Sequence, residues 1–180
     1  MPREQQLNEV IGDQIKQLSL KKAGISREVD YSYLVETPFI TVISGIRRCG
    51  KSTLLFQLTQ KFDTYYYVNF DDERFFDFTV ADFQTLMILL KKRYQTKTIF
   101  LDEIQNIPGW ERFVRRLYDE GYKIFITGSN SKLLSSELAT HLTGRYIKIE
   151  LYPFSFTEYL KFKGVDTSEV STDTKSQIRE

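Results

Sequence analysis

Little in this sequence points to secretion or to insertion in a membrane. It contains one cysteine in 180 residues, which excludes a disulfide bond within the chain. Its longest purely apolar run, residues 86–90, is far too short to span a bilayer, and the N-terminal sequence MPREQQ lacks the apolar segment of a signal peptide. These absences lead us to expect a cytoplasmic protein that has no membrane-spanning segment.

The sequence also lacks an excess of charge of either sign. Lysine and arginine total 25 and aspartate and glutamate total 24, so the net charge is +1. This balance provides no general attraction to nucleic acid or to an anionic membrane, so a local patch would have to recognise either partner. The length of 180 residues and the aromatic content of 14% instead favour one domain with a sizeable core.

The most informative stretch is residues 45–52, which read G-x-x-x-x-G-K-S directly after the largely apolar run 39–43. The two glycines let the backbone turn with its N–H groups pointing inward, where they bind phosphate oxygens. We expect Lys51 to reach the β- and γ-phosphates, and the Ser52 hydroxyl to ligate Mg²⁺ at the N-terminus of the following helix. The residues predicted to bind the nucleotide are Gly45, Ile46, Arg47, Arg48, Cys49, Gly50, Lys51, Ser52 and Thr53.

A second motif is a pair of acids at the end of the apolar strand predicted at 97–103. Asp102 has the position of a Walker B carboxylate, which holds Mg²⁺ opposite the Ser52 hydroxyl. Since Mg²⁺ needs only one protein carboxylate, Glu103 is predicted to orient and partly deprotonate the attacking water. A solvated strand end would explain the two acids alone, but the phosphate loop upstream favours the catalytic interpretation.

Two further groups are expected near the γ-phosphate. A polar probe follows the strand predicted at 122–127, and either Ser129 or Asn130 fits this role. Arg145 is the cation best placed by chain order, acting either in its own subunit or as a finger in a neighbouring subunit's site. An ordinary surface ion pair explains Arg145 equally well.

The remaining patterns predict an α/β domain. Apolar residues at helical spacing from Leu7 to Leu18 predict an N-terminal amphipathic helix. Capping boxes at Thr79/Asp82 and at Ser155/Glu158 predict the starts of two more helices, and a further helix is predicted at 133–142. The predicted strands are residues 39–43, 64–70, 97–103, 122–127 and 145–151, the last of them nearer an edge. Such alternation of strands and helices predicts a mostly parallel sheet between helical layers.

We divide the chain into three parts. Residues 1–30 are predicted to be a helical segment packed on the domain, 31–163 the nucleotide-binding domain, and 164–180 a polar tail or linker. The segment that ends at Pro38 is expected either to cover the sheet or to help form an adenine pocket. Within it, Tyr31 and Tyr33 either stack on the base or simply pack.

The motifs together resemble the AAA+-like P-loop ATPases of bacteria and archaea. They are G-x-R-R-x-G-K-S at 45–52, D-E-x-Q at 102–105, G-S-N-S at 128–131, T-G-R at 143–145 and P-F-S-F-x-E-Y-L at 153–160. The resemblance implies a P-loop NTPase three-layer α/β/α fold with sheet order 5-1-4-3-2, and ATP rather than GTP as the ligand. It also implies that Asn69, at the end of the second strand, pairs with the catalytic Glu103 until a ligand arrives.

Similar proteins usually continue into a helical lid and a separate C-terminal domain, so the resemblance covers a nucleotide-binding domain alone. The protein partner that we expect is therefore either another copy of the chain, in a homo-oligomer, or a missing C-terminal domain. The leading hypothesis is a Mg²⁺-dependent ATPase that couples hydrolysis to a conformational change. The alternatives are a nucleotide-gated switch with little turnover and, less favoured, a small-molecule kinase, which would need an acceptor pocket.

Overall fold

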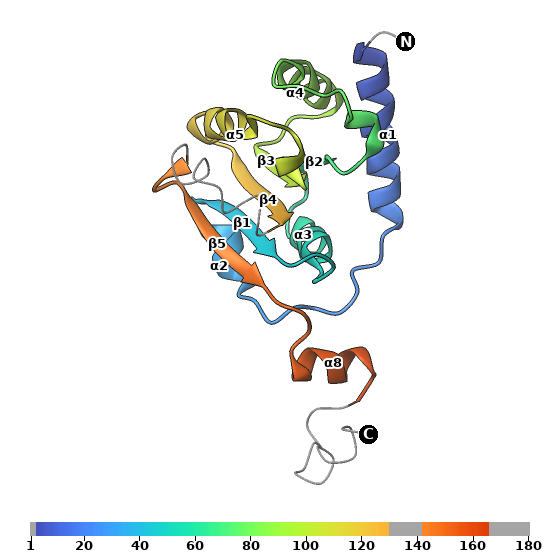
Figure 1. The fold of residues 1–180 in the computed structure, drawn as a ribbon, viewed down its shortest axis with the longest axis vertical. Coiled ribbons are helices and arrows are strands. Elements are labelled where there is room, and N and C mark those ends of the chain that lie inside the picture. The colour runs from blue at the N-terminus through green and yellow to red at the C-terminus, as the bar shows by residue number, and fades with distance from the viewer. Residues whose placement is uncertain (1–2, 130–141, 166–180) are drawn as a thin grey trace.

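A parallel five-stranded sheet forms the centre of the computed structural model, which describes residues 3–129 and 142–165 (Figure 1). The strands are β1 (Ile40–Gly45), β2 (Tyr66–Asn69), β3 (Thr98–Asp102), β4 (Lys123–Ser129) and β5 (Tyr146–Leu151). They lie in the order β2-β3-β4-β1-β5, and each neighbouring pair is parallel. This arrangement confirms the predicted sheet order, including the position of the acid-bearing strand β3 between β4 and β2.

Burial of the strands follows their sequence pattern. The interior strand β1 is buried along its whole length, as its uninterrupted β-branched and small residues predict. The edge strand β5 alternates between partly buried and exposed residues, which confirms its predicted place at an edge. Because all strands are parallel, their carboxyl ends lie at one edge of the sheet. There Gly45 is in register with Ser129, and Asn69 with Asp102.

Helices cover both faces of the sheet, giving the predicted α/β/α layers (Figure 1). One face packs against α1 (Arg3–Leu20), α4 (Asp82–Arg93) and α5 (Trp110–Asp119), and the other against α2 (Tyr31–Glu36) and α3 (Lys51–Thr59). Short 3-10 helices follow β2 (Glu73–Phe75) and β3 (Ile104–Asn106). The predicted apolar stripe of α1 is buried except for Ile15, which is partly buried. Among the helices of residues 3–129 and 142–165, none has the length and hydropathy of a transmembrane span.

The helix α8 (Phe156–Phe162) follows β5 and lies below the sheet in Figure 1. Its start confirms the predicted capping box, because the Ser155 side chain accepts a hydrogen bond from the Glu158 N–H while the Glu158 carboxylate accepts one from the Ser155 N–H. Only Glu158 and Leu160 of this helix are buried. Helix α8 is therefore attached to the domain through few side chains.

One predicted helix start is wrong. Helix α4 begins at Asp82 with Ala81 as its N-cap, although the pattern predicted a capping box opened by Thr79. The Asp82 carboxylate accepts from the Thr79 N–H at 2.8 Å, so one half of the predicted box is present. The other half is absent, because the Thr79 hydroxyl donates to that carboxylate and the Asp82 N–H donates to the Thr79 carbonyl. Arg3 also binds that carboxylate, and this contact with α1 was invisible to a local pattern. The helix predicted at 133–142 lies outside the described residues except for Leu142, which is buried in the core.

Candidate functional site

The predicted phosphate loop connects the end of β1 to the start of α3. A Cβ atom added at Gly45 would lie 2.3 Å from the Leu151 carbonyl oxygen and 2.7 Å from Cys49 Sγ. Only glycine therefore fits between the loop and the neighbouring strand β5. Gly50 has a φ of +97°, a left-handed conformation that also favours glycine, and it leads directly into α3.

The Lys51 side chain is folded back inside this loop and is only 5% exposed. Its ammonium group donates to the carbonyl oxygens of Gly45 and Ile46, at 3.3 and 3.0 Å. It also lies 4.0 Å from Glu103 Oε1. The structure thus brings the predicted phosphate-binding cation and the predicted catalytic acid together, although they lie on different elements.

Ser52 and Asp102 meet as the two predicted metal ligands. The Ser52 hydroxyl donates to Asp102 Oδ1 at 3.0 Å, and Asp102 is 2% exposed. A hydroxyl and a carboxylate oxygen are hard donors of the kind that Mg²⁺ prefers, with phosphate and water oxygens completing its shell. Among residues 3–129 and 142–165, no cluster of three or more His, Cys, Asp or Glu side chains offers an alternative metal site.

Two buried hydroxyl groups that the sequence analysis missed hold the Asp102 carboxylate. Thr127 of β4 donates to Asp102 Oδ1, and Tyr67 of β2 donates to Asp102 Oδ2 at 3.2 Å. Burial, and then the negative charge of Asp102, raise the pKa of Tyr67 far above its ordinary value, so the phenol remains a donor. The sequence offered one signal for this contact. Thr127 ends the otherwise apolar run IFIT, and a buried hydroxyl group needs a hydrogen-bond partner.

Glu103 follows β3 with a φ of +51°, an uncommon left-handed conformation for a residue other than glycine. Its N–H donates to Thr127 Oγ1 at 3.0 Å, and its carboxylate accepts a hydrogen bond from Gln105. Asn69 Oδ1 instead accepts from the Asp71 N–H at 2.9 Å. The pairing of Asn69 with Glu103 implied by the resemblance is therefore not the arrangement in this structure, because each side chain has a partner in its own turn.

The structure does not bring the predicted polar probe and the predicted cation Arg145 together. Ser129 ends β4 beside Gly45, at the same edge as the phosphate loop, whereas Asn130 lies outside the described residues. Arg145 lies at the opposite, amino-terminal ends of the strands, where its carbonyl accepts a hydrogen bond from the Ile40 N–H at the start of β1. A strand advances about 3.3 Å per residue, so the length of β1 separates Arg145 from its own phosphate loop. Its predicted role in its own subunit is wrong. The alternative of a surface ion pair is present, because Arg145 Nε lies 3.9 Å from Asp119 Oδ1, and a role in a neighbouring subunit stays a prediction.

A cavity of about 600 Å³ lies beside the phosphate loop. It is lined by Gly24, Ile25, Arg27, Arg48, Cys49, Gly50, Thr53, Pro153, Phe154 and Phe162. The segment before Pro38 thus contributes to a cavity next to the loop, and its helix α1 covers one face of the sheet. That the cavity takes adenine stays a prediction. The two tyrosines do not line this cavity, because Tyr31 donates to Gln57 at 2.6 Å and Tyr33 is exposed on α2.

Comparisons with known proteins agree with this architecture. Residues 37–160 match a family model described as an AAA domain. The chain is 41% identical over 173 residues to the uncharacterized protein MJ1544 of Methanocaldococcus jannaschii, a match that covers 94% of the chain and 38% of that protein. It is 41% identical over 170 residues to an uncharacterized protein of Haemophilus influenzae, covering 86% of the chain and 42% of that protein. The chain therefore spans less than half the length of these curated relatives.

Solved structures share the fold at low sequence identity. The chain is similar to AMPPCP-bound DnaA from Aquifex aeolicus, with a TM-score of 0.53 and 17% identity over 82% of this chain and 52% of that one. It is also similar to Hsp104 in a closed state, with a TM-score of 0.60 and 16% identity over 84% of this chain and 31% of that one. At these identities the similarities show the fold alone, and they confirm the predicted α/β/α architecture.

Proposed function

The chain belongs to the AAA domain family, and on this premise we propose that it is a Mg²⁺-dependent ATPase domain that couples ATP hydrolysis to a conformational change. The observation that carries the proposal is the convergence of Lys51, the Ser52–Asp102 pair and Glu103 at the carboxyl edge of the sheet. Phosphoryl transfer to water depends mainly on positioning and on charge neutralisation, and these groups would supply both.

In the proposed complex the loop N–H groups and Lys51 bind the phosphates. Lys51 exchanges its contacts with the Gly45 and Ile46 carbonyls for phosphate oxygens, which are stronger acceptors for an ammonium group. Ser52 and Asp102 would hold Mg²⁺, which would supply neutralisation of the phosphate charge. Tyr67 and Thr127 keep the Asp102 carboxylate in one orientation, as donors around a metal ligand do.

Glu103 is the proposed base. Its side chain lies within 4.0 Å of Lys51, next to the position that the γ-phosphate would occupy, where it can orient water and accept its proton. Either Ser129, which ends β4, or Asn130 is proposed to contact the γ-phosphate. The cavity of about 600 Å³ is the proposed adenosine site, since ligand pockets are typically mostly apolar and its lining includes Ile25, Phe154 and Phe162.

The substitution Glu103→Gln separates an ATPase from a switch that binds ATP with little turnover. Glutamine keeps the size and hydrogen-bonding reach of the side chain but removes the base. An ATPase should retain nucleotide binding and lose turnover by about 10²- to 10⁴-fold, the usual contribution of a general base. The assay is single-turnover hydrolysis combined with equilibrium titration. An unchanged hydrolysis rate in this variant would show that Glu103 is not the base.

The proposal as a whole is tested by phosphate release with Mg²⁺-ATP and with Mg²⁺-GTP, comparing the wild type with Lys51→Ala. We expect the wild type to release phosphate from ATP and the variant to lose both binding and turnover. Equal release by the two proteins would mean that the activity comes from a contaminant or from another site. Phosphate release without any added acceptor would also argue against a small-molecule kinase.

A further inference from the structure

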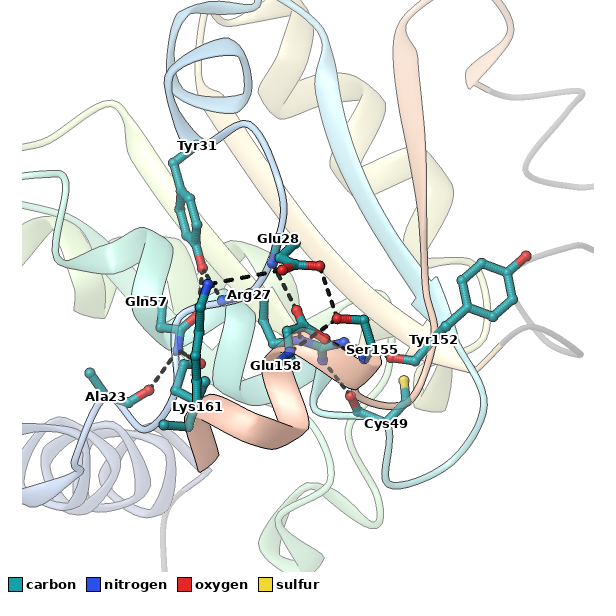
Figure 2. Close-up of polar contacts among 11 residues, drawn as sticks. Ala23, Arg27, Glu28, Tyr31, Cys49, Gln57, Tyr152, Ser155, Glu158 and Lys161 are labelled. Atoms are coloured by element: carbon teal, nitrogen blue, oxygen red, sulfur yellow. Dashed lines mark hydrogen bonds and ion pairs between the residues drawn. The ribbon is translucent and has the colours of Figure 1, made fainter. Parts of the chain in front are cut away.

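A buried ion pair lies beside the phosphate loop (Figure 2). Arg27 Nε donates to Glu158 Oε1 at 2.9 Å, and both side chains are only 4% exposed. Arg27 belongs to the segment between α1 and α2, whereas Glu158 belongs to α8, so the pair joins residues that are 131 positions apart in the sequence. None of the roles proposed above for nucleotide hydrolysis uses either residue.

The same guanidinium group also holds the phosphate loop. Arg27 Nη1 donates to the Cys49 carbonyl and Nη2 to the Tyr152 carbonyl, both at 2.7 Å (Figure 2). A Cβ atom at Gly50 would lie 3.1 Å from Arg27 Nη1, so the guanidinium packs directly against the loop residue before Lys51. The planar fork of one arginine therefore connects the phosphate loop, the end of β5 and α8, a geometry that lysine cannot reproduce.

The chain on either side of Arg27 is fixed independently. Gln57 of α3 donates to the Ala23 and Ile25 carbonyls, each at 2.7 Å, and the Arg27 N–H donates to the Tyr31 hydroxyl at 3.1 Å. Since α3 is the helix that begins with the phosphate loop, these contacts place Arg27 relative to the loop. The part of the network that can change is consequently its connection to α8.

Glu158 provides that connection. One of its oxygens accepts from Arg27 and from the Glu28 N–H, and the other accepts from the Ser155 N–H in the capping box. Burial alone would raise the pKa of Glu158, but the hydrogen bonds from Arg27 and from these N–H groups outweigh it and hold the pKa below its usual range. The side chain thus remains a carboxylate that fastens the first turn of α8 to Arg27.

A purely stabilising role accounts poorly for this arrangement, because desolvation cancels much of the attraction within a buried ion pair. The location of the pair is more informative. Arg27, though not Glu158, lines the proposed adenosine cavity, together with Phe154 and Phe162 at the two ends of the α8 region. The Arg27 guanidinium carbon lies 5.1 Å from the centre of the Phe154 ring. A nucleotide bound there would contact the loop, Arg27 and α8 together.

We propose that Arg27 is a positioning residue and that the Arg27–Glu158 pair couples the phosphate loop to α8, so that nucleotide binding and the attachment of α8 strengthen each other. This inference rests on the proposed nucleotide site. By thermodynamic linkage, the factor by which bound nucleotide favours the attached position of α8 equals the factor by which attachment of α8 increases nucleotide affinity. Helix α8 buries only Glu158 and Leu160, so its attachment is weak enough to change when nucleotide binds.

The experiment measures Mg²⁺-AMPPCP affinity and amide hydrogen exchange in residues 156–162, with and without the nucleotide. In the wild type we expect the nucleotide to slow exchange in α8 at least fivefold. In Arg27→Lys and Glu158→Gln we expect about tenfold weaker binding and no nucleotide-dependent protection of α8. A double variant, Arg27→Met with Glu158→Met, leaves no unpaired charge and should fold even if the single variants do not.

The matched control is Lys161→Ala. Lys161 Nζ lies 3.9 Å from Glu28 Oε1, so it joins α8 to the same segment, but both side chains are about half exposed and neither contacts the loop. This variant should bind the nucleotide within twofold of the wild type and keep the protection of α8. A wild type without saturable binding overturns the proposed function. A wild type that binds while α8 exchange is unchanged, or a double variant that binds and protects α8 normally, overturns the coupling alone.

Discussion

Tyr67→Phe isolates one hydrogen bond to the carboxylate proposed to bind Mg²⁺. The substitution removes only the phenol oxygen, which lies 3.2 Å from Asp102 Oδ2, and leaves the ring packing intact. Hydrogen bonds to charged groups contribute about 1.5–3 kcal/mol, and we expect the lower end, about 1.5 kcal/mol, because this bond is long. For a chain of this length that loss corresponds to a melting temperature about 3–6 °C lower.

The adjacent residue provides a matched control. Tyr66 is buried in the core on the other face of the sheet, and its hydroxyl donates to the Tyr94 carbonyl at 2.8 Å, a neutral acceptor. Tyr66→Phe should cost about 0.5–1.5 kcal/mol, the usual contribution of a neutral hydrogen bond, and should leave Mg²⁺ dependence unchanged. Tyr67→Phe should in addition weaken Mg²⁺ by about tenfold or more, as the loss of a group that orients a metal ligand typically does.

Two measurements check these values. Urea unfolding of the three proteins gives the free energy of unfolding, and Mg²⁺ titration at saturating ATP gives the metal dependence. If Tyr67→Phe and Tyr66→Phe show the same Mg²⁺ dependence, the Tyr67 hydroxyl does not orient Asp102. A loss of stability below about 0.5 kcal/mol in Tyr67→Phe would mean that the buried carboxylate finds another donor.

Two further predictions concern the loop and the pH dependence of stability. Gly45→Ala forces a Cβ atom to within 2.3 Å of the Leu151 carbonyl oxygen. We expect this substitution to lower the free energy of unfolding by about 1–3 kcal/mol and to weaken nucleotide binding. Gly121→Ala is the control, because a Cβ atom there meets no atom within 4 Å, and it should leave nucleotide binding unchanged. Burial lowers the pKa of Lys123 to about 8 from its ordinary 10.5, so below pH 8 the folded state bears the full cost of the buried charge, and stability rises with pH above 8. The difference in urea midpoint between wild type and Lys123→Met should therefore change between pH 8 and 10, and a constant difference would contradict the assignment.

The local patterns in the chain predicted the elements that depend on nearby residues. The G-x-x-x-x-G-K-S motif has a fixed geometry, because two glycines, a lysine and a serine act within one turn of backbone. The position of Asp102 followed from the apolar strand before it, and the capping box at Ser155 and Glu158 from residues three apart. Such features require no knowledge of the rest of the fold. They were sufficient to predict the strand order through the resemblance, and the sheet confirms it.

Contacts between side chains far apart in the chain could not be predicted from local patterns, because they depend on how the elements pack. Arg145 follows a loop motif, yet the direction of β5 places it at the far edge of the sheet from its own phosphate loop. Tyr66 and Tyr67 look alike in the sequence, and only the pleat of β2 assigns one to the core beneath α1 and the other to Asp102. Arg27 and Glu158 carried no motif that linked them, since their ion pair forms only when β5 delivers α8 to the segment after α1. Local residue patterns thus specify which chemical groups are available where the strands end, whereas packing between segments far apart in the chain sets how those groups are held and connected.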